Sequence, residues 1–143
     1  MSVKDILAAK GHDVYSVDNG VKLRDAITML NNKNIGVVLI TEQSGGLVGI
    51  LSERDIIRRS LTQETGFRDE PVTTSMTSNV KTVPSSASID EVMELMTSSR
   101  IRHLPVIDDG KIVGLISIGD VVKRKIAQAE SEAANLRDYI AAV

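Results

Sequence analysis

The sequence repeats itself once, and this repetition restricts the fold more than any other feature. The segments Gly49–Asp55 and Gly114–Asp120 both read Gly-apolar-apolar-Ser-x-x-Asp and start 65 residues apart. The match continues upstream, where Asp25–Leu30 aligns with Asp90–Leu95 at the same spacing. Two copies that keep their register over several segments predict two similar folded units rather than one irregular domain.

Each copy predicts strand, helix, strand, strand and helix, in that order. Apolar residues three and four positions apart indicate the helices, and Gly-containing turns between apolar runs indicate the hairpins. Ser52, Ser88 and Ser117 are expected to cap the helices that follow them. The first hairpin is expected to be two residues longer than the second. The predicted strands are 16–17, 36–40 and 47–51 in the first copy, and 81–83, 104–107 and 112–116 in the second.

The chain is expected to form an α+β fold in which two β-α-β-β-α repeats pack face to face. A repeat of roughly 50 residues buries too little apolar surface to be stable alone. In chain order we divide the sequence into a first repeat with its N-terminal segment (1–66), a linker with the second repeat (67–127) and a C-terminal helical tail (128–143).

The composition argues against several classes of function. The net charge is −2 and aromatic residues make up 2% of the chain, which disfavours a nucleic-acid binder with a basic, stacking surface. Without cysteine, neither disulfides nor thiolate metal sites are expected. No apolar run is long enough to cross a membrane and no signal-peptide pattern is present, so a cytoplasmic location is expected. We expect neither a metal site nor a set of catalytic residues, and therefore no enzyme.

The repeated Ser-x-x-Asp pattern permits two interpretations. A serine and an acid at a helix start can serve only to cap the helix N-terminus and to complement its partial positive charge. The same groups can also bind a ligand, because an acidic side chain can accept hydrogen bonds from ribose hydroxyls. A helix N-terminus is also a favourable place for a phosphate.

Taken together, these residues resemble a tandem pair of cystathionine beta-synthase (CBS) domains. The resemblance rests on the two repeated motifs, on Val80–Pro84 and on Arg100–Val106, and it extends from about Val3 to Arg124. It implies two repeats related by a pseudo-two-fold axis, with two clefts that each take an adenosine derivative such as AMP, ADP, ATP, NAD or S-adenosylmethionine. It also implies a regulatory module that requires no cofactor, forms a homodimer and acts on an unidentified protein partner.

The resemblance assigns ligand contacts to particular residues. Asp55 and Asp120 would each accept hydrogen bonds from a ribose, with Ser52 and Ser117 beside the sugar or phosphate. An early Ser or Thr in each copy would contact the base or sugar, and basic residues would reach phosphates. The full set of predicted ligand-binding residues is Ser16, Gly36, Ser52, Arg54, Asp55, Thr82, Arg102, His103, Ser117 and Asp120.

The two copies are unequal in charge. Arg102 and His103 of the second copy would reach a phosphate, whereas Ile35 and Gly36 are expected at the equivalent positions of the first copy. One strong cleft and one weak or empty cleft are therefore expected. Three alternatives stay open: a sensor of S-adenosylmethionine, a structural homodimer with vestigial clefts, and a small nucleotide hydrolase. The lack of a general base and of metal ligands disfavours the hydrolase.

Overall fold

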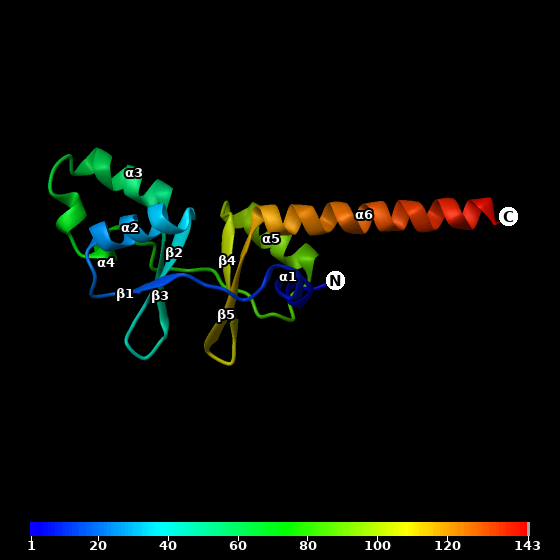
Figure 1. The fold of residues 1–143 in the computed structure, drawn as a ribbon, viewed down its shortest axis with the longest axis horizontal. Helices are drawn as coiled ribbons and strands as arrows, with labels where there is room; N and C mark the ends of the chain where they lie inside the picture. The colour runs from blue at the N-terminus through cyan, green and yellow to red at the C-terminus, as the bar shows by residue number, and fades with distance from the viewer. Residues whose placement is uncertain (143) are drawn as a thin grey trace.

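The computed structural model describes residues 1–142, and it has the α+β architecture that the sequence predicts (Figure 1). Two small sheets face each other at the centre, and the helices lie outside them. The elements are α1 (Val3–Lys10), β1 (Ser16–Asp18), α2 (Leu23–Lys33), β2 (Val37–Thr41), β3 (Leu47–Ser52), α3 (Glu53–Thr62), η1 (Phe67–Asp69), α4 (Val72–Ser75), α5 (Ile89–Ser99), β4 (His103–Asp108), β5 (Lys111–Ser117) and α6 (Ile118–Ala141).

The three predicted serine caps are confirmed. The hydroxyl oxygen of Ser52 accepts from the backbone N–H of Asp55 at 3.4 Å, and that of Ser117 accepts from Asp120 at 3.2 Å. Ser88 caps α5 in the same way, accepting from the N–H of Glu91 at 3.0 Å. In each case the carboxylate of the acid in turn accepts a hydrogen bond from the backbone N–H of its serine. The backbone N–H groups of the serine and of the acid are therefore both satisfied.

The first sheet has three strands and the second has two. In the first sheet β1 runs parallel to β2, and β2 is antiparallel to β3; in the second, β4 is antiparallel to β5. The predicted strand 81–83 is wrong, because only Val83 pairs there, with Val106. A missing hydrogen-bond donor accounts for the difference. In the first sheet the N–H of Leu39 binds the carbonyl of Tyr15 at 3.0 Å, whereas the equivalent position in β4 is Pro105, which has no N–H.

Each repeat packs against a helix that lies before the other repeat in the chain. Val3, Ile6 and Leu7 of α1 belong to the core of the second repeat, and Val72 of α4 belongs to the core of the first. The backbone repeats this arrangement: Val3 N–H binds Ala87 O at 2.9 Å, and Val72 N–H binds Val21 O at 3.0 Å. Packing therefore joins α1 to the second repeat, and 67–76 to the first. The division in chain order stays a prediction, and part of the expected linker is folded.

The glycine of the repeated motif permits this crossed packing. A Cβ atom placed on Gly114 would lie 2.6 Å from Leu7 Cδ2, and one on Gly49 would lie 2.3 Å from Met76 Sδ. Both distances are too short for real contacts, so each helical segment reaches its strand only where the side chain is missing.

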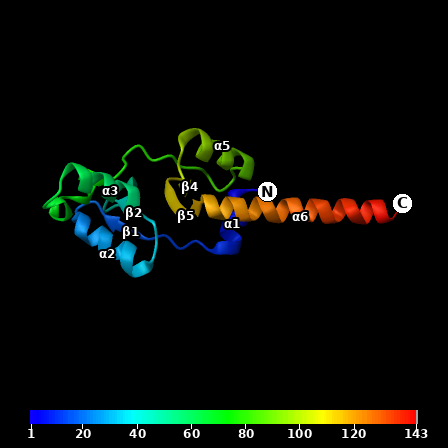
Figure 2. The same cartoon turned by 90° about the horizontal axis from the view of Figure 1, so that it is seen from above.

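The last helix of the second repeat and the expected C-terminal tail form one unbroken helix, α6. Beyond its first turns it projects away from both repeats, as Figures 1 and 2 show from two directions. Within residues 1–142, no helix has the length and apolar character needed to cross a membrane.

Candidate functional site

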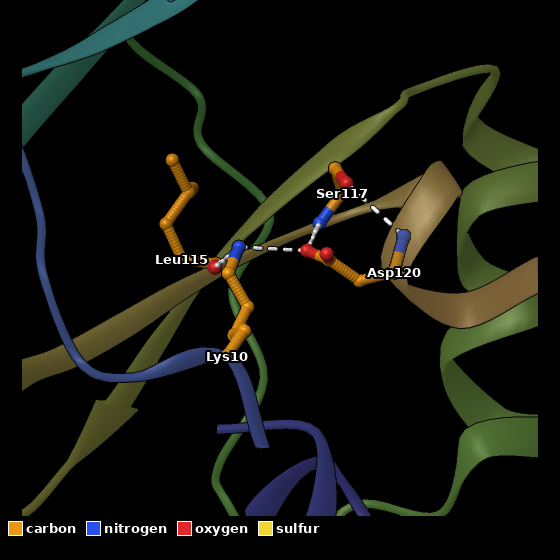
Figure 3. Close-up of polar contacts among 4 residues, drawn as sticks. All are labelled: Lys10, Leu115, Ser117 and Asp120. Carbon is orange, nitrogen blue, oxygen red and sulfur yellow. Dashed lines mark hydrogen bonds and ion pairs between the residues drawn. The ribbon is translucent and has the colours of Figure 1, made fainter. Parts of the chain in front are cut away.

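The strongest concentration of predicted site residues lies where β5 runs into α6. Asp120 Oδ2 accepts a hydrogen bond from the backbone N–H of Ser117 at 2.9 Å. The same oxygen lies 2.7 Å from Lys10 Nζ, and this ammonium also donates to the carbonyl of Leu115 at 2.9 Å (Figure 3). Lys10 was not predicted from the sequence. It comes from the end of α1, 110 residues away in the chain.

Asp120 is held in its charged form by these contacts. Partial burial by itself would raise the pKa of the Asp120 carboxyl. The hydrogen bonds from Lys10 and Ser117, with the charge of Lys10, outweigh that effect and bring the pKa below its ordinary value. About a quarter of the Asp120 side chain remains exposed.

Arg102 and His103, at the start of β4, lie across from the residues that lead into α6. His103 faces Ser117 across the β4–β5 ladder, and the carbonyl of Arg102 accepts from the N–H of Ile118 at 2.8 Å. His103 is partly buried, and this burial lowers its pKa, as do the charges of Lys10 and Arg102, against the opposing effect of Asp120. The structure thus brings together four of the predicted residues (Arg102, His103, Ser117 and Asp120) and adds Lys10 to them.

The equivalent corner of the first repeat has the same backbone but a different charge. Asp55 Oδ2 accepts from the N–H of Ser52 at 2.8 Å and from its hydroxyl at 3.0 Å. Its other oxygen accepts from the hydroxyl of Thr77 at 3.3 Å. Thr77 also exchanges two backbone hydrogen bonds with Ile50 of β3. Among residues 1–142, no cation pairs with Asp55.

The strand register corrects the expected correspondence between the copies. Val37 faces Ser52 as His103 faces Ser117, and Gly36 O accepts from Glu53 N–H as Arg102 O accepts from Ile118 N–H. Gly36 and Val37, rather than Ile35 and Gly36, are therefore equivalent to Arg102 and His103. The first hairpin is one residue longer than the second, not two, because Ile40 pairs with Gly49 and Val106 with Gly114. The contrast in charge between the copies remains.

The other predicted residues are exposed and less constrained. Ser16 pairs with Leu39 through the backbone of β1, and Thr82 precedes Val83 at the equivalent place in the second repeat. Arg54 is exposed in the first turn of α3. Gly36 lies in an open groove of about 480 Å³ between α2 and α3, which contains neither Asp55 nor Asp120. Within the described part of the chain, no cluster of acids and histidines has the arrangement of a metal site.

Comparison with known proteins gives one consistent result. The sequence model for the CBS domain matches residues 3–62 and 71–126. A CBS-domain protein from Agrobacterium tumefaciens, ATU1752, superimposes with a TM-score of 0.83 at 39% identity, covering 87% of this chain and 92% of that one. The CBS pair of MJ0100, solved with 5-methylthioadenosine and S-adenosyl-L-methionine, gives 0.77 at 27% identity, covering 90% of this chain and 98% of that one. PAE2072 from Pyrobaculum aerophilum, solved with AMP, gives 0.74 at 26% identity, covering 84% of this chain and 89% of that one.

Proposed function

The chain belongs to the CBS domain family, and on that premise we propose that it is a regulatory module that binds an adenosine-containing nucleotide at Asp120. The matched family is not a catalytic one. The nucleotides that we propose are AMP, ADP, ATP and NAD, held without turnover. A cytoplasmic location and a regulated protein partner remain predictions.

The observation that carries this proposal is the grouping of one carboxylate and three basic residues, Lys10, Arg102 and His103, at a helix N-terminus. Asp120 provides acceptors for a ribose diol. Lys10 pairs with it, and Arg102 and His103 at the start of β4 are further donors for a phosphate. In the first turn of α6 the N–H groups of Ile118 and Asp120 are already bonded, which leaves that of Gly119 for a ligand. A nucleotide carries a diol and a phosphate a few bonds apart, so its sugar can bind Asp120 while its phosphate binds the neighbouring basic residues.

S-adenosylmethionine differs from the nucleotides in charge, because it lacks a phosphate and carries a positive sulfonium. It would be repelled by the cations around Asp120 but not by the Asp55 corner, where Gly36 and Val37 replace Arg102 and His103. S-adenosylmethionine is therefore the second candidate ligand, which we propose at Asp55. The MJ0100 pair, solved with S-adenosyl-L-methionine, supports the choice of this molecule.

The test is calorimetric titration of the purified protein with AMP, adenosine, S-adenosylmethionine and CMP. We expect AMP to bind more tightly than adenosine, because only AMP carries a phosphate for the cations. We expect CMP not to bind, because the proposed ligand class is adenosine-containing. Chromatography of the titrated AMP should recover it unchanged. Absence of binding by all adenosine compounds at millimolar concentration would leave only the structural-homodimer alternative, and conversion of the AMP would favour the hydrolase.

A further inference from the structure

Helix α6 carries a continuous apolar stripe that begins in the second repeat and runs along the part of the helix that projects beyond it. Six residues spaced alternately four and three apart form it, and we call them the α6 seam: Val122, Ile126, Ala129, Ala133, Leu136 and Ile140. All six are exposed, and the exposed fraction rises along the helix from 43% at Val122 to 64% at Ile140. Alternating steps of four and three are the spacing of coiled-coil core positions. A stripe of this kind predicts another helix along it.

We propose that the α6 seam pairs with the α6 seam of a second copy of this chain, parallel and in register. Flanking charges select this arrangement. In heptad notation Ile126 and Ala133 occupy position a of this seam. In a parallel pair, the residue just before an a position faces the residue five places further along on the partner helix. Lys125 would then face Glu130 of the other copy, and Glu132 would face Arg137. Both contacts of this kind within the seam join opposite charges, and the two-fold axis makes each occur twice.

An antiparallel pair that overlaps the whole seam brings like charges together. Glu130 would face Glu130 of the other helix, and Glu132 would face Glu132. At the ends Lys123 would lie opposite Arg137. Like charges at these positions disfavour a coiled coil, so the sequence of α6 discriminates against this orientation.

The first repeat also carries exposed apolar residues on its last helix. Ile57 and Leu61 of α3 are the equivalents of Val122 and Ile126 in the repeat, and they are 60% and 77% exposed. Helices α3 and α6 lie along the upper edge of the molecule in Figure 1, and in Figure 2, which is seen from above, they follow roughly one line. A second copy placed along this edge, with the symmetry axis parallel to α6, would cover both apolar stripes at once.

The seam by itself makes a weak pair. A helix of 24 residues is about 36 Å long, and the six seam residues cover fewer than three heptads. Ala129 and Ala133 bury little surface, and Lys125 already pairs with Asp90 of its own chain at 2.9 Å. The expected dimer is therefore concentration-dependent, and Glu132 and Arg137 are its most informative charges.

The chain has no cysteine, and this allows a direct test by single-cysteine cross-linking. A parallel, in-register pair brings identical seam residues together, so Leu136→Cys should form a disulfide-linked dimer under mild oxidation. Ser131→Cys is the matched control, because residue 131 lies on the opposite side of the helix from the seam. Equal cross-linking of the two variants, or none at position 136, would overturn the proposal, even if the protein dimerises elsewhere.

A charge exchange tests the register by light scattering over a range of concentrations. Glu132→Arg and Arg137→Glu should each raise the dissociation constant of the dimer severalfold, and the double variant should restore it. Leu136→Glu should raise it at least tenfold, whereas Asn135→Glu should leave it unchanged. No change with Leu136→Glu would exclude the seam. Titration of the same variants with AMP keeps this result separate from the proposed function, because residues 131–137 lie far along α6 from Asp120.

Discussion

The Ser-x-x-Asp corners of the two repeats have the same backbone geometry, but different side chains contact their carboxylates. At both Asp55 and Asp120, a serine cap and a returning hydrogen bond fix the acid in the first turn of a helix. At Asp55 the neighbouring segment supplies the hydroxyl of Thr77, and at Asp120 it supplies the ammonium of Lys10. The repeated motif thus determines the geometry of the site, and residues outside the motif determine its charge.

Lys10 competes with a ligand for the carboxylate of Asp120. Lys10 ends α1, and the same helix places Val3, Ile6 and Leu7 in the core of the second repeat. Its ammonium occupies an oxygen of Asp120 that a ribose would use. A ligand at this end must therefore share Asp120 with Lys10 or displace it. At Asp55 the competing group is a neutral hydroxyl at 3.3 Å, which is more easily displaced.

The largest expected effect is the loss of AMP affinity when the charge of Asp120 is removed. Asp120→Asn keeps an acceptor for the Ser117 backbone but loses the charged bonds to a ribose. Hydrogen bonds to a charged group contribute about 1.5–3 kcal/mol each, so AMP affinity should fall at least tenfold. Asp55→Asn is the matched variant, and calorimetry should show little change in AMP binding. Equal losses in the two variants would remove the difference between the ends, and no loss in either would reduce both acids to helix caps.

The next effect separates phosphate from sugar. Arg102→Gly gives the second repeat the residue that the first repeat has at Gly36. If Arg102 binds phosphate, AMP affinity should fall about tenfold, in line with the loss of one charge-assisted bond, while adenosine affinity should not change. The measurement is titration of parent and variant with both ligands. An equal loss of adenosine affinity would mean that Arg102 holds other parts of the site in place and does not bind the phosphate.

Much of this contrast can be predicted from sequence, and the reasons are local. Ser117 and Asp120 are separated by one helical turn, and His103 faces Ser117 as soon as the hairpin is paired. Lys10 could not be predicted in this way, because its contact depends on α1 crossing to the second repeat. The only signal is faint: Val3 and Leu7 precede the first repeat as Val72 and Met76 precede the second.

The errors within the repeats have equally local causes. The strand expected at 81–83 fails because Pro105 cannot donate the hydrogen bond that Leu39 donates. The expected equivalence of the basic residues was displaced by one position, because the lengths of the hairpins are set by strand register and not by the motif. The glycine of the motif was identified as part of the repeat, but its role in admitting Leu7 or Met76 depends on packing between distant segments.

A smaller effect tests the competition by Lys10. Lys10→Met keeps most of the aliphatic length and removes the charge, so Asp120 loses its internal partner. Adenosine, which has no phosphate to lose contact with, should then bind about threefold more tightly, the size expected for releasing a partly exposed ion pair. Thr77→Val is the matched change at Asp55 and should leave adenosine binding at Asp120 unaltered. Weaker adenosine binding by Lys10→Met would show that Lys10 assists the sugar instead of competing with it.

The smallest effect is a pH dependence confined to the second repeat. Burial, with the charges of Lys10 and Arg102, lowers the pKa of His103 despite Asp120, so the folded protein takes up this proton less readily than the unfolded chain. The stabilisation is complete above the unfolded pKa of about 6.5 and is lost as the pH falls through the lower folded value. The carboxyls whose pKa values are lowered, Asp120 among them, lose their contribution only below about pH 4.

Thermal unfolding between pH 8 and 5.5 should therefore isolate His103, with a decrease in melting temperature on the order of 2 °C. His103→Val, which copies Val37 of the first repeat, should flatten the profile over this interval. Bound AMP should do the same, because a phosphate beside His103 favours its protonated form and raises its pKa. A profile that is the same in parent and variant, with and without AMP, would place the phosphate away from His103, leaving Lys10 and Arg102 as the cations to which it binds.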